Sequence, residues 1–240
     1  MPDYARFCPV ALASSVIADR WTPLILREMV IGSTRFNDIA RGLPGISRSL
    51  LVQRLKHLER NGVVERWPSA TGRGHEYRLT PAGRDLEPVL IALGKWAVHW
   101  LFHELEPHEV DPVTLTWWMH RRVDRDAAPD SRVVIQFDHT APERKSIWMV
   151  FDRGDPSVCI QHPGFEPDVV VKTSTPALAE VFQGYTTWAR SVAVGDITIE
   201  GPPRLIRAFP RWFEWSPFAA ATQARLELDH EPVNTLRHAG

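Results

Sequence analysis

Four polar side chains between Arg48 and Arg54 have the chemistry needed to read base edges in nucleic acid. Arg48 and Arg54 can each donate two parallel hydrogen bonds to guanine, and Gln53 can pair with adenine in the same two-point way. Ser49 adds a hydroxyl group that both donates and accepts. The alternative is that these residues form the solvated face of an ordinary charged helix.

A second candidate is the loop SATGRGH, in which Gly72 and Gly74 flank Arg73. A phosphate cradle would require a helix directly after the glycines, and here the next residues alternate like a strand, so we reject that interpretation. Two alternatives remain. The loop is a wing that holds Arg73 forward into a minor groove or against phosphate, or it is a plain hairpin turn.

The elements that must position these side chains are short helices followed by a hairpin. The apolar spacing predicts a helix that starts at Cys8-Pro9, another after Thr22-Pro23 and a short one within STRFNDIARGLPG. The basic helix, about residues 47–60, begins at the cap Ser47 and ends at Asn61-Gly62. The segments VVERW and HEYRLT are predicted strands around the loop, so the order is that of a winged helix-turn-helix.

Five segments in this order resemble the HxlR family, a branch of the MarR-like winged-helix transcription regulators. They are CPV, DRWTPLILRE, RFNDIARGLPGIS, LLVQRLKHLERNGVVER and YRLTPAGRDLEPVL. The resemblance implies a cytoplasmic homodimer that binds double-stranded DNA, with dimer contacts made by the terminal helices. The candidate DNA contacts in the recognition helix and the wing (about residues 66–78) are Arg35, Ser47, Arg48, Ser49, Gln53, Arg54, Arg73 and His75.

Composition is consistent with this interpretation. The chain has 240 residues with 44% hydrophobic and 24% charged side chains, and no apolar run long enough to span a bilayer. Between Arg35 and Arg84, ten Arg and Lys stand against four Asp and Glu, whereas the sequence from Val110 onward is slightly acidic. A basic segment beside an acidic one is typical of a two-part chain with an anionic partner. We therefore expect a cytoplasmic protein without a signal peptide.

The second half predicts an α+β domain in which helices cover an antiparallel sheet. Its segment DVVVKTSTPALAEVFQG and the turn GDITIEG are similar to the sterol-carrier-protein domain, which implies a tunnel for a lipid or another hydrophobic molecule. Tentative ligand contacts are Trp117, Phe137, Trp148, Phe182, Tyr185, Trp188, Phe209, Trp212 and Phe213. The alternative for these rings is an ordinary core. The expected divisions are residues 1–108, 112–222 and a loosely ordered tail, 223–240.

Two smaller features have competing interpretations. Cys8 at a helix start could sense oxidants, as in some members of the resembled family, or it could be a small buried apolar residue. His99 and His103 have the spacing of a metal pair but no obvious third ligand, so we predict a solvated face and no metal or cofactor.

The sequence therefore predicts a DNA-binding regulator of a pseudo-palindromic operator, modulated by a hydrophobic small molecule in the C-terminal domain. The alternative is a lipid or hydrophobic-metabolite carrier in which the winged helix serves dimerisation. An enzyme is not predicted, because no GxSxG, HExxH or dinucleotide-type GxGxxG motif occurs.

Overall fold

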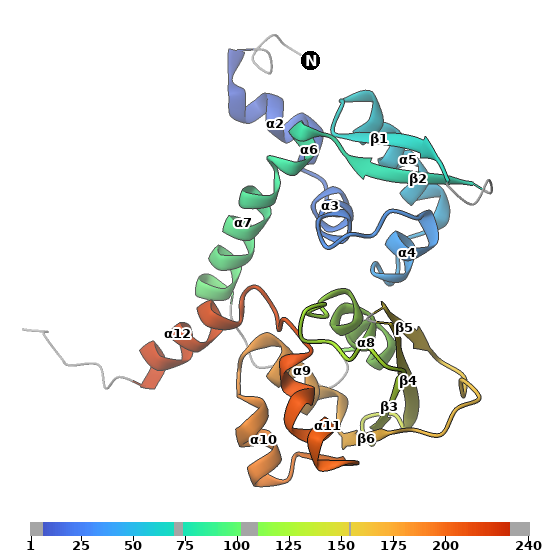
Figure 1. Cartoon of the computed structure of the whole chain (residues 1–240). Helices are drawn as coiled ribbons and strands as arrows, with labels where there is room; N and C mark the ends of the chain where they lie inside the picture. Colours follow the sequence, from blue (N-terminus) through green and yellow to red (C-terminus); the bar gives the residue numbers. More distant parts are fainter. Residues whose placement is uncertain (1–6, 70–73, 102–109, 154, 231–240) are drawn as a thin grey trace, which may run out of the picture. The chain divides into compact units, whose positions relative to one another are not determined.

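The computed structural model describes residues 7–69, 74–101, 110–153 and 155–230. The chain forms two compact units, Met1–Leu93 and Gly94–Gly240, called here the N-terminal and C-terminal units. Figure 1 shows the helices and strands of each unit. No helix in the described part of the chain is both long and apolar enough to cross a membrane.

The N-terminal unit has the predicted order of helices followed by a hairpin. Its elements are α2 (Pro9–Ile17), α3 (Thr22–Val30), α4 (Phe36–Arg41), α5 (Arg48–Arg60), β1 (Val64–Pro68), β2 (His75–Leu79) and α6 (Pro81–Arg84). Helix α7 (Glu87–Trp100) begins in this unit and continues into the next. The core contains inward side chains from α3, α4 and α5 and from the open end of the hairpin, where β1 begins and β2 ends: Ile25, Leu26, Met29, Ile39, Leu43, Leu51, Leu55, Leu58, Val63, Val64 and Leu79.

Local hydrogen bonds explain where these helices begin. The Ser47 hydroxyl accepts from the backbone N–H of Leu50 (3.2 Å) and caps α5, as the sequence predicts. Thr80 caps α6 in the same way, accepting from Gly83 N–H (3.1 Å). Gly83 is required there by space, because a Cβ at this position would lie 2.2 Å from the carbonyl oxygen of Val63. The segment TPAG thereby fixes the start of α6 against the end of β2.

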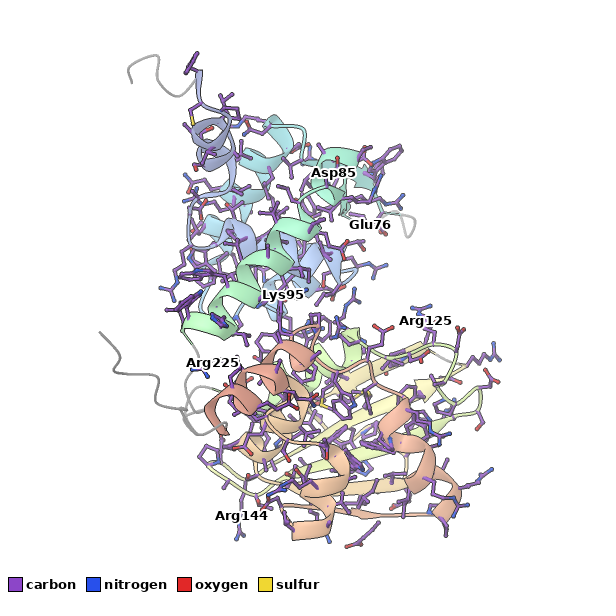
Figure 2. The ribbon with its side chains drawn as sticks, turned by 90° about the vertical axis from the view of Figure 1, so that its left-hand side faces the viewer. Glu76, Asp85, Lys95, Arg125, Arg144 and Arg225 are labelled. Carbon is purple, nitrogen blue, oxygen red and sulfur yellow. The ribbon has the colours of Figure 1, made fainter. Side chains whose placement is uncertain are left out.

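The C-terminal unit is an α+β structure. Its elements are α8 (Pro112–Arg121), β3 (Val133–His139), β4 (Lys145–Asp152), β5 (Asp155–Cys159), β6 (Val169–Thr173), α9 (Thr175–Gln183), α10 (Trp188–Val194), β7 (Ile197–Glu200), α11 (Pro203–Ala208), the 3-10 helix η1 (Phe209–Arg211) and α12 (Ala219–His230). Helix α12 includes residues 223–230, where the sequence predicts a loose tail, and residues 231–240 lie outside the described part. Arg225 of α12, labelled in Figure 2, donates to the carbonyl oxygen of His99 (3.3 Å).

The sheet is mixed, and the prediction of an antiparallel sheet is wrong in this respect. The strand order is β5-β4-β3-β6-β7, and β6 runs parallel to β3 while the other pairs are antiparallel. The reason is the connection of residues 160–168, which leaves β5 at one edge and returns across the sheet instead of forming a hairpin. His162 of this connection contacts the ring of Trp148 edge-on, at 5.4 Å between centroids.

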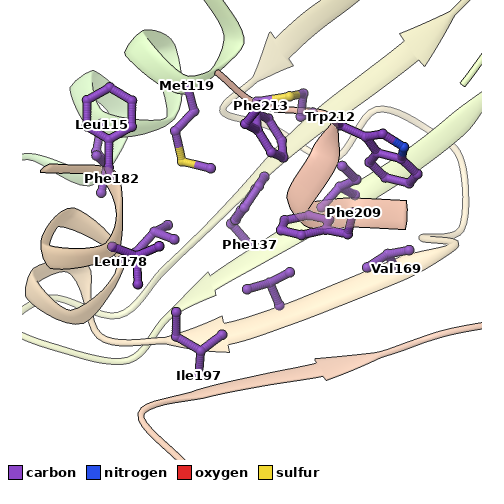
Figure 3. Close-up of a cluster of buried hydrophobic side chains, with 14 of the residues drawn as sticks. Leu115, Met119, Phe137, Val169, Leu178, Phe182, Ile197, Phe209, Trp212 and Phe213 are labelled. Atoms are coloured by element: carbon purple, nitrogen blue, oxygen red, sulfur yellow. The ribbon is translucent and has the colours of Figure 1, made fainter. Parts of the chain in front are cut away.

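The core of the C-terminal unit lies between one sheet face and the helices. Figure 3 shows Phe137 of β3 surrounded by side chains from α8, α9 and η1. Phe137 and Phe209 are fully buried, with ring centroids 6.2 Å apart. Leu115, Met119, Val169, Leu178, Phe182, Ile197, Trp212 and Phe213 complete the labelled cluster.

Candidate nucleic-acid interface

Helix α5 presents a polar stripe to solvent while its leucines enter the core. The outward residues recur at the spacing of one helix face, so they occupy an arc of about 140° at roughly 100° per residue. All five are exposed: Arg48, Ser49, Val52, Gln53 and Lys56. We call them the α5 outer face. An α-helix fits a B-DNA major groove, where polar side chains of the types found on this face can form hydrogen bonds with base edges.

Arg48 is held in place by the preceding helix. One of its guanidinium nitrogens donates to Asn37 Oδ1 (3.0 Å), and the guanidinium carbon lies 5.0 Å from the ring centroid of Phe36. The cation–π contact and the hydrogen bond restrict a long side chain that would otherwise move freely. Arg48 is therefore positioned before any ligand arrives, which lowers the entropy cost of binding.

Arg54 does not belong to this face. Its guanidinium forms an ion pair with Asp19 Oδ2 (3.0 Å) at the flank of α5. The same carboxylate accepts hydrogen bonds from the backbone N–H groups of Trp21 and Thr22 and from the Thr22 hydroxyl (2.6 Å). Asp19 thus joins the start of α3 to the middle of α5, and its ion pair with Arg54 helps to orient α5 within the N-terminal unit.

Burial and charge act in opposite directions on Asp19. Burial raises the pKa of its carboxyl group, whereas the hydrogen bonds from Thr22 and Trp21 and the positive charge of Arg54 lower it. The net pKa lies below the ordinary value for aspartate. Asp19 is therefore ionised at neutral pH and can hold all of these donors.

The hairpin is tied to the helix-turn-helix by backbone contacts. Arg35 forms an isolated β-bridge with Glu76, which Figure 2 labels, and the N–H of Tyr77 donates to the Thr34 carbonyl (2.7 Å). The side chain of Arg35 is exposed at the start of α4. His75 is exposed at the start of β2, opposite Pro68. These contacts place β2 beside the entry to α4.

The other predicted contacts have mixed positions. Ser47 is exposed and uses its hydroxyl as the α5 cap, where it also lies 3.2 Å from the hydroxyl of Ser49. Arg73, at the tip of the predicted wing, lies outside the described residues. Val52 and Lys56 also lie on the α5 outer face, although neither is among the residues predicted from the sequence to contact DNA. The spacing of about one helical turn from Arg48 to Val52, and again from Val52 to Lys56, is the sequence pattern that places both residues on the same face.

Cys8 occupies the residue before α2 with extended backbone dihedrals, and its side chain makes no capping hydrogen bond. It is half-buried and is a free thiol, as is Cys159 in the other unit. His103 lies outside the described residues, so the expectation that His99 and His103 lie on a solvated face stays a prediction.

Most of the predicted ligand contacts lie together in the C-terminal unit. Trp188 packs on Phe209 at 4.7 Å between ring centroids, and Phe209 contacts Trp212 and Phe213. Trp148 is separate: it pairs across the sheet with Gln136, and its indole N–H donates to the Gln136 side-chain oxygen (3.0 Å). Its ring therefore lies on the sheet face opposite the core. Tyr185 follows α9 and is half-buried.

Comparison with known proteins supports the interpretation of the N-terminal unit. Residues 16–105 match the model of the HxlR-like helix-turn-helix. The relative YvaP of Bacillus subtilis strain 168, named an uncharacterized HTH-type transcriptional regulator, is 39% identical over 100 residues, which are 40% of this chain and 92% of that protein. The chain belongs to the HxlR-like helix-turn-helix family. The comparisons thereby confirm the family that the sequence predicts for the N-terminal unit.

Two other similar proteins match a segment of about the same length. The regulator sll1512 of Synechocystis sp., also named uncharacterized and HTH-type, is 37% identical over 41% of this chain and 74% of its own length. The solved reduced form of the transcriptional regulator YodB from B. subtilis is 35% identical, with a TM-score of 0.36, over 39% of this chain and 93% of that chain. The family match and the two sequence relatives each cover about two fifths of the protein, so the resemblance of the C-terminal unit to sterol-carrier domains stays a prediction.

Proposed function

We propose that the protein is a homodimeric regulator that binds a pseudo-palindromic DNA operator through α5 and the adjoining wing. The observation that carries this proposal is the α5 outer face, whose exposed donors and acceptors include a prepositioned arginine. A dimer would place two such helices in successive major grooves, about one helical turn apart. Membership of a family of transcription regulators supports the same conclusion.

Replacing Arg48 by alanine should weaken specific DNA binding by about 1–3 kcal/mol, because a two-point contact to a base would be lost. Fluorescence anisotropy with duplex DNA from upstream of its own coding region, measured at several salt concentrations, tests this. Arg204→Ala is the matched control, since it removes the same charge from an exposed arginine of the C-terminal unit. Equal affinity of the Arg48→Ala variant and the wild type would contradict the role of Arg48.

The dimer is proposed from an exposed apolar stripe on α7. Val89, Leu93, Trp96 and Trp100 follow one another at intervals of four, three and four residues, which is the seam spacing of paired helices. Each of these four side chains is exposed, and Trp96 retains 54% of its accessible surface. Val10 and Leu12 of α2 are exposed as well. Apolar surface of this extent and regularity fits a second copy of the chain.

Replacing Trp96 by glutamate should raise the dimer dissociation constant on the order of thirtyfold, since a central interface tryptophan commonly contributes about 2 kcal/mol. Sedimentation equilibrium measures the change directly. Lys95→Glu is the control, because it places the same carboxylate on the neighbouring exposed position of α7, which Figure 2 labels. A Trp96→Glu protein that remains as dimeric as the Lys95→Glu protein would exclude α7 as the seam.

A hydrophobic effector in the C-terminal unit completes the proposal. The aromatic cluster around Phe209 supports it, together with one buried polar atom, His139 Nε2, which has no hydrogen-bond partner among the described residues. Ligand sites combine apolar walls with a few such polar groups. To regulate, the molecule must bind one dimer state better than the other. Native mass spectrometry of the protein as purified, followed by DNA binding with and without any bound molecule, tests this part.

A further inference from the structure

One apolar side chain interrupts the polar α5 outer face. Val52 lies at its centre, one helical turn after Arg48 and one turn before Lys56, with Gln53 beside it. It retains 39% of its accessible surface, whereas the neighbouring Leu51 and Leu55 are fully buried. No other residue of α5 is a large hydrophobic side chain exposed to solvent in the described structure.

Neither helix formation nor the core requires a valine at this position. Val52 is not part of the core cluster of the N-terminal unit. A β-branched side chain also loses rotamer freedom in a helix, so alanine would favour the helix more. A protein partner would need a contiguous apolar patch, and here one valine is surrounded by groups that form hydrogen bonds.

We propose that Val52 recognises the C5-methyl group of a thymine in each half-site. The thymine methyl is the apolar group that a base pair displays in the major groove, and it accepts contact from small apolar side chains. Arg48 and Gln53 would then select the neighbouring bases by hydrogen bonding, while Val52 selects thymine by shape and by exclusion of water. This inference rests on the proposed function, because it assumes that α5 occupies the major groove.

The experiment begins with selection of bound duplexes from a random library, using the full-length wild-type protein. Each thymine of the selected half-site is then replaced by deoxyuridine, which lacks the methyl group and keeps every hydrogen-bonding group. At one position this change should weaken binding to the wild type about fourfold, the effect of burying one methyl group. The Val52→Ala protein should bind thymine DNA several-fold more weakly than the wild type and should not distinguish thymine from uridine at that position.

Two controls isolate the contact. Val194→Ala makes the same change at an exposed valine of the C-terminal unit and should retain the discrimination. Circular dichroism should show equal helix content and melting temperature for Val52→Ala and wild type, because the side chain is exposed and alanine favours helix. The uridine scan with wild-type protein remains decisive even if a variant folds poorly.

The possible results distinguish failure of DNA recognition by the protein from failure of the Val52 contact alone. A wild-type protein that selects no sequence would overturn the proposed function and this inference together. A clear selected sequence with uridine effects below twofold at every thymine would overturn the role of Val52 alone. So would a Val52→Ala protein that still discriminates uridine from thymine as strongly as the wild type does.

Discussion

Replacing Asp19 by alanine should lower the free energy of unfolding of the N-terminal unit by about 2–4 kcal/mol at neutral pH. The carboxylate accepts three hydrogen bonds at the start of α3 and pairs with Arg54 of α5. Its removal leaves the fully buried hydroxyl of Thr22 without this acceptor. It also removes the ion pair with Arg54 that helps to orient α5. Hydrogen exchange measured by mass spectrometry follows the N-terminal unit separately from the rest of the chain.

Asp19→Asn is the informative comparison. Its side-chain oxygen can still accept from the backbone of Trp21 and Thr22, but the charge opposite Arg54 is lost. The free energy of unfolding of this variant should therefore fall by about half as much as that of Asp19→Ala, because asparagine caps a helix as well as aspartate does. An Asp19→Ala protein whose α3 and α5 amides exchange as slowly as those of the wild type would show that the network contributes nothing.

Lowering the pH from about 6.5 to about 4 should destabilise the C-terminal unit through His139, by an amount that reaches roughly 3 kcal/mol. Burial lowers the pKa of this imidazole to about 4, and the repulsion from Lys145 acts in the same direction, while Asp111 and Asp138 raise the pKa by less. The ring is 2% exposed at the end of β3, with Nδ1 3.0 Å from the hydroxyl of Thr175.

Stability falls with pH because the pKa of His139 is lower in the folded chain than in the unfolded chain. The unfolded chain binds a proton at His139 near the ordinary pKa of about 6.5, whereas the folded chain stays neutral down to about pH 4. Above pH 6.5 both states are neutral and the full stability is present. Between these values protonation favours the unfolded chain, so stability falls with pH, and below pH 4 the loss no longer grows.

A substitution separates this effect from general acid unfolding. His139→Asn keeps a polar group near Thr175 but cannot titrate in this range, so hydrogen exchange of β3 and β6 should depend less steeply on pH. His162→Asn, which changes an exposed histidine of the same unit, is the control and should follow the wild type. If His139→Asn and wild type lose protection in parallel from pH 6.5 to 4, His139 does not cause the acid sensitivity.

Several elements could be predicted from the sequence because their signals are local. Ser47 caps α5 through a hydrogen bond three residues away, and the leucine spacing of α5 selects its buried face. The same holds for the strands of the hairpin, whose residues alternate in the sequence. These features depend on residues within one or two turns of one another.

Other features depend on partners that are distant in the sequence. Arg54 has the same chemistry as Arg48 and lies only six residues later, yet one pairs with Asp19 and the other with Asn37 on the exposed side. No local rule distinguishes them, because the flank of α5 that meets α3 is decided by packing. Pairing of β6 with β3 likewise follows from the path of the 160–168 connection rather than from strand propensity.

The sequence by itself therefore determined the HxlR-like order of helices and hairpin, the capping of α5 and the basic character of that segment. Only the tertiary structure decided that Arg54 forms an ion pair with Asp19, that Trp148 faces away from the aromatic core, and that the sheet is mixed. The physical reason is that hydrogen bonding and periodicity act within a few residues. Ion pairs, sheet order and the exposure of a side chain depend on elements that folding brings together from distant parts of the chain.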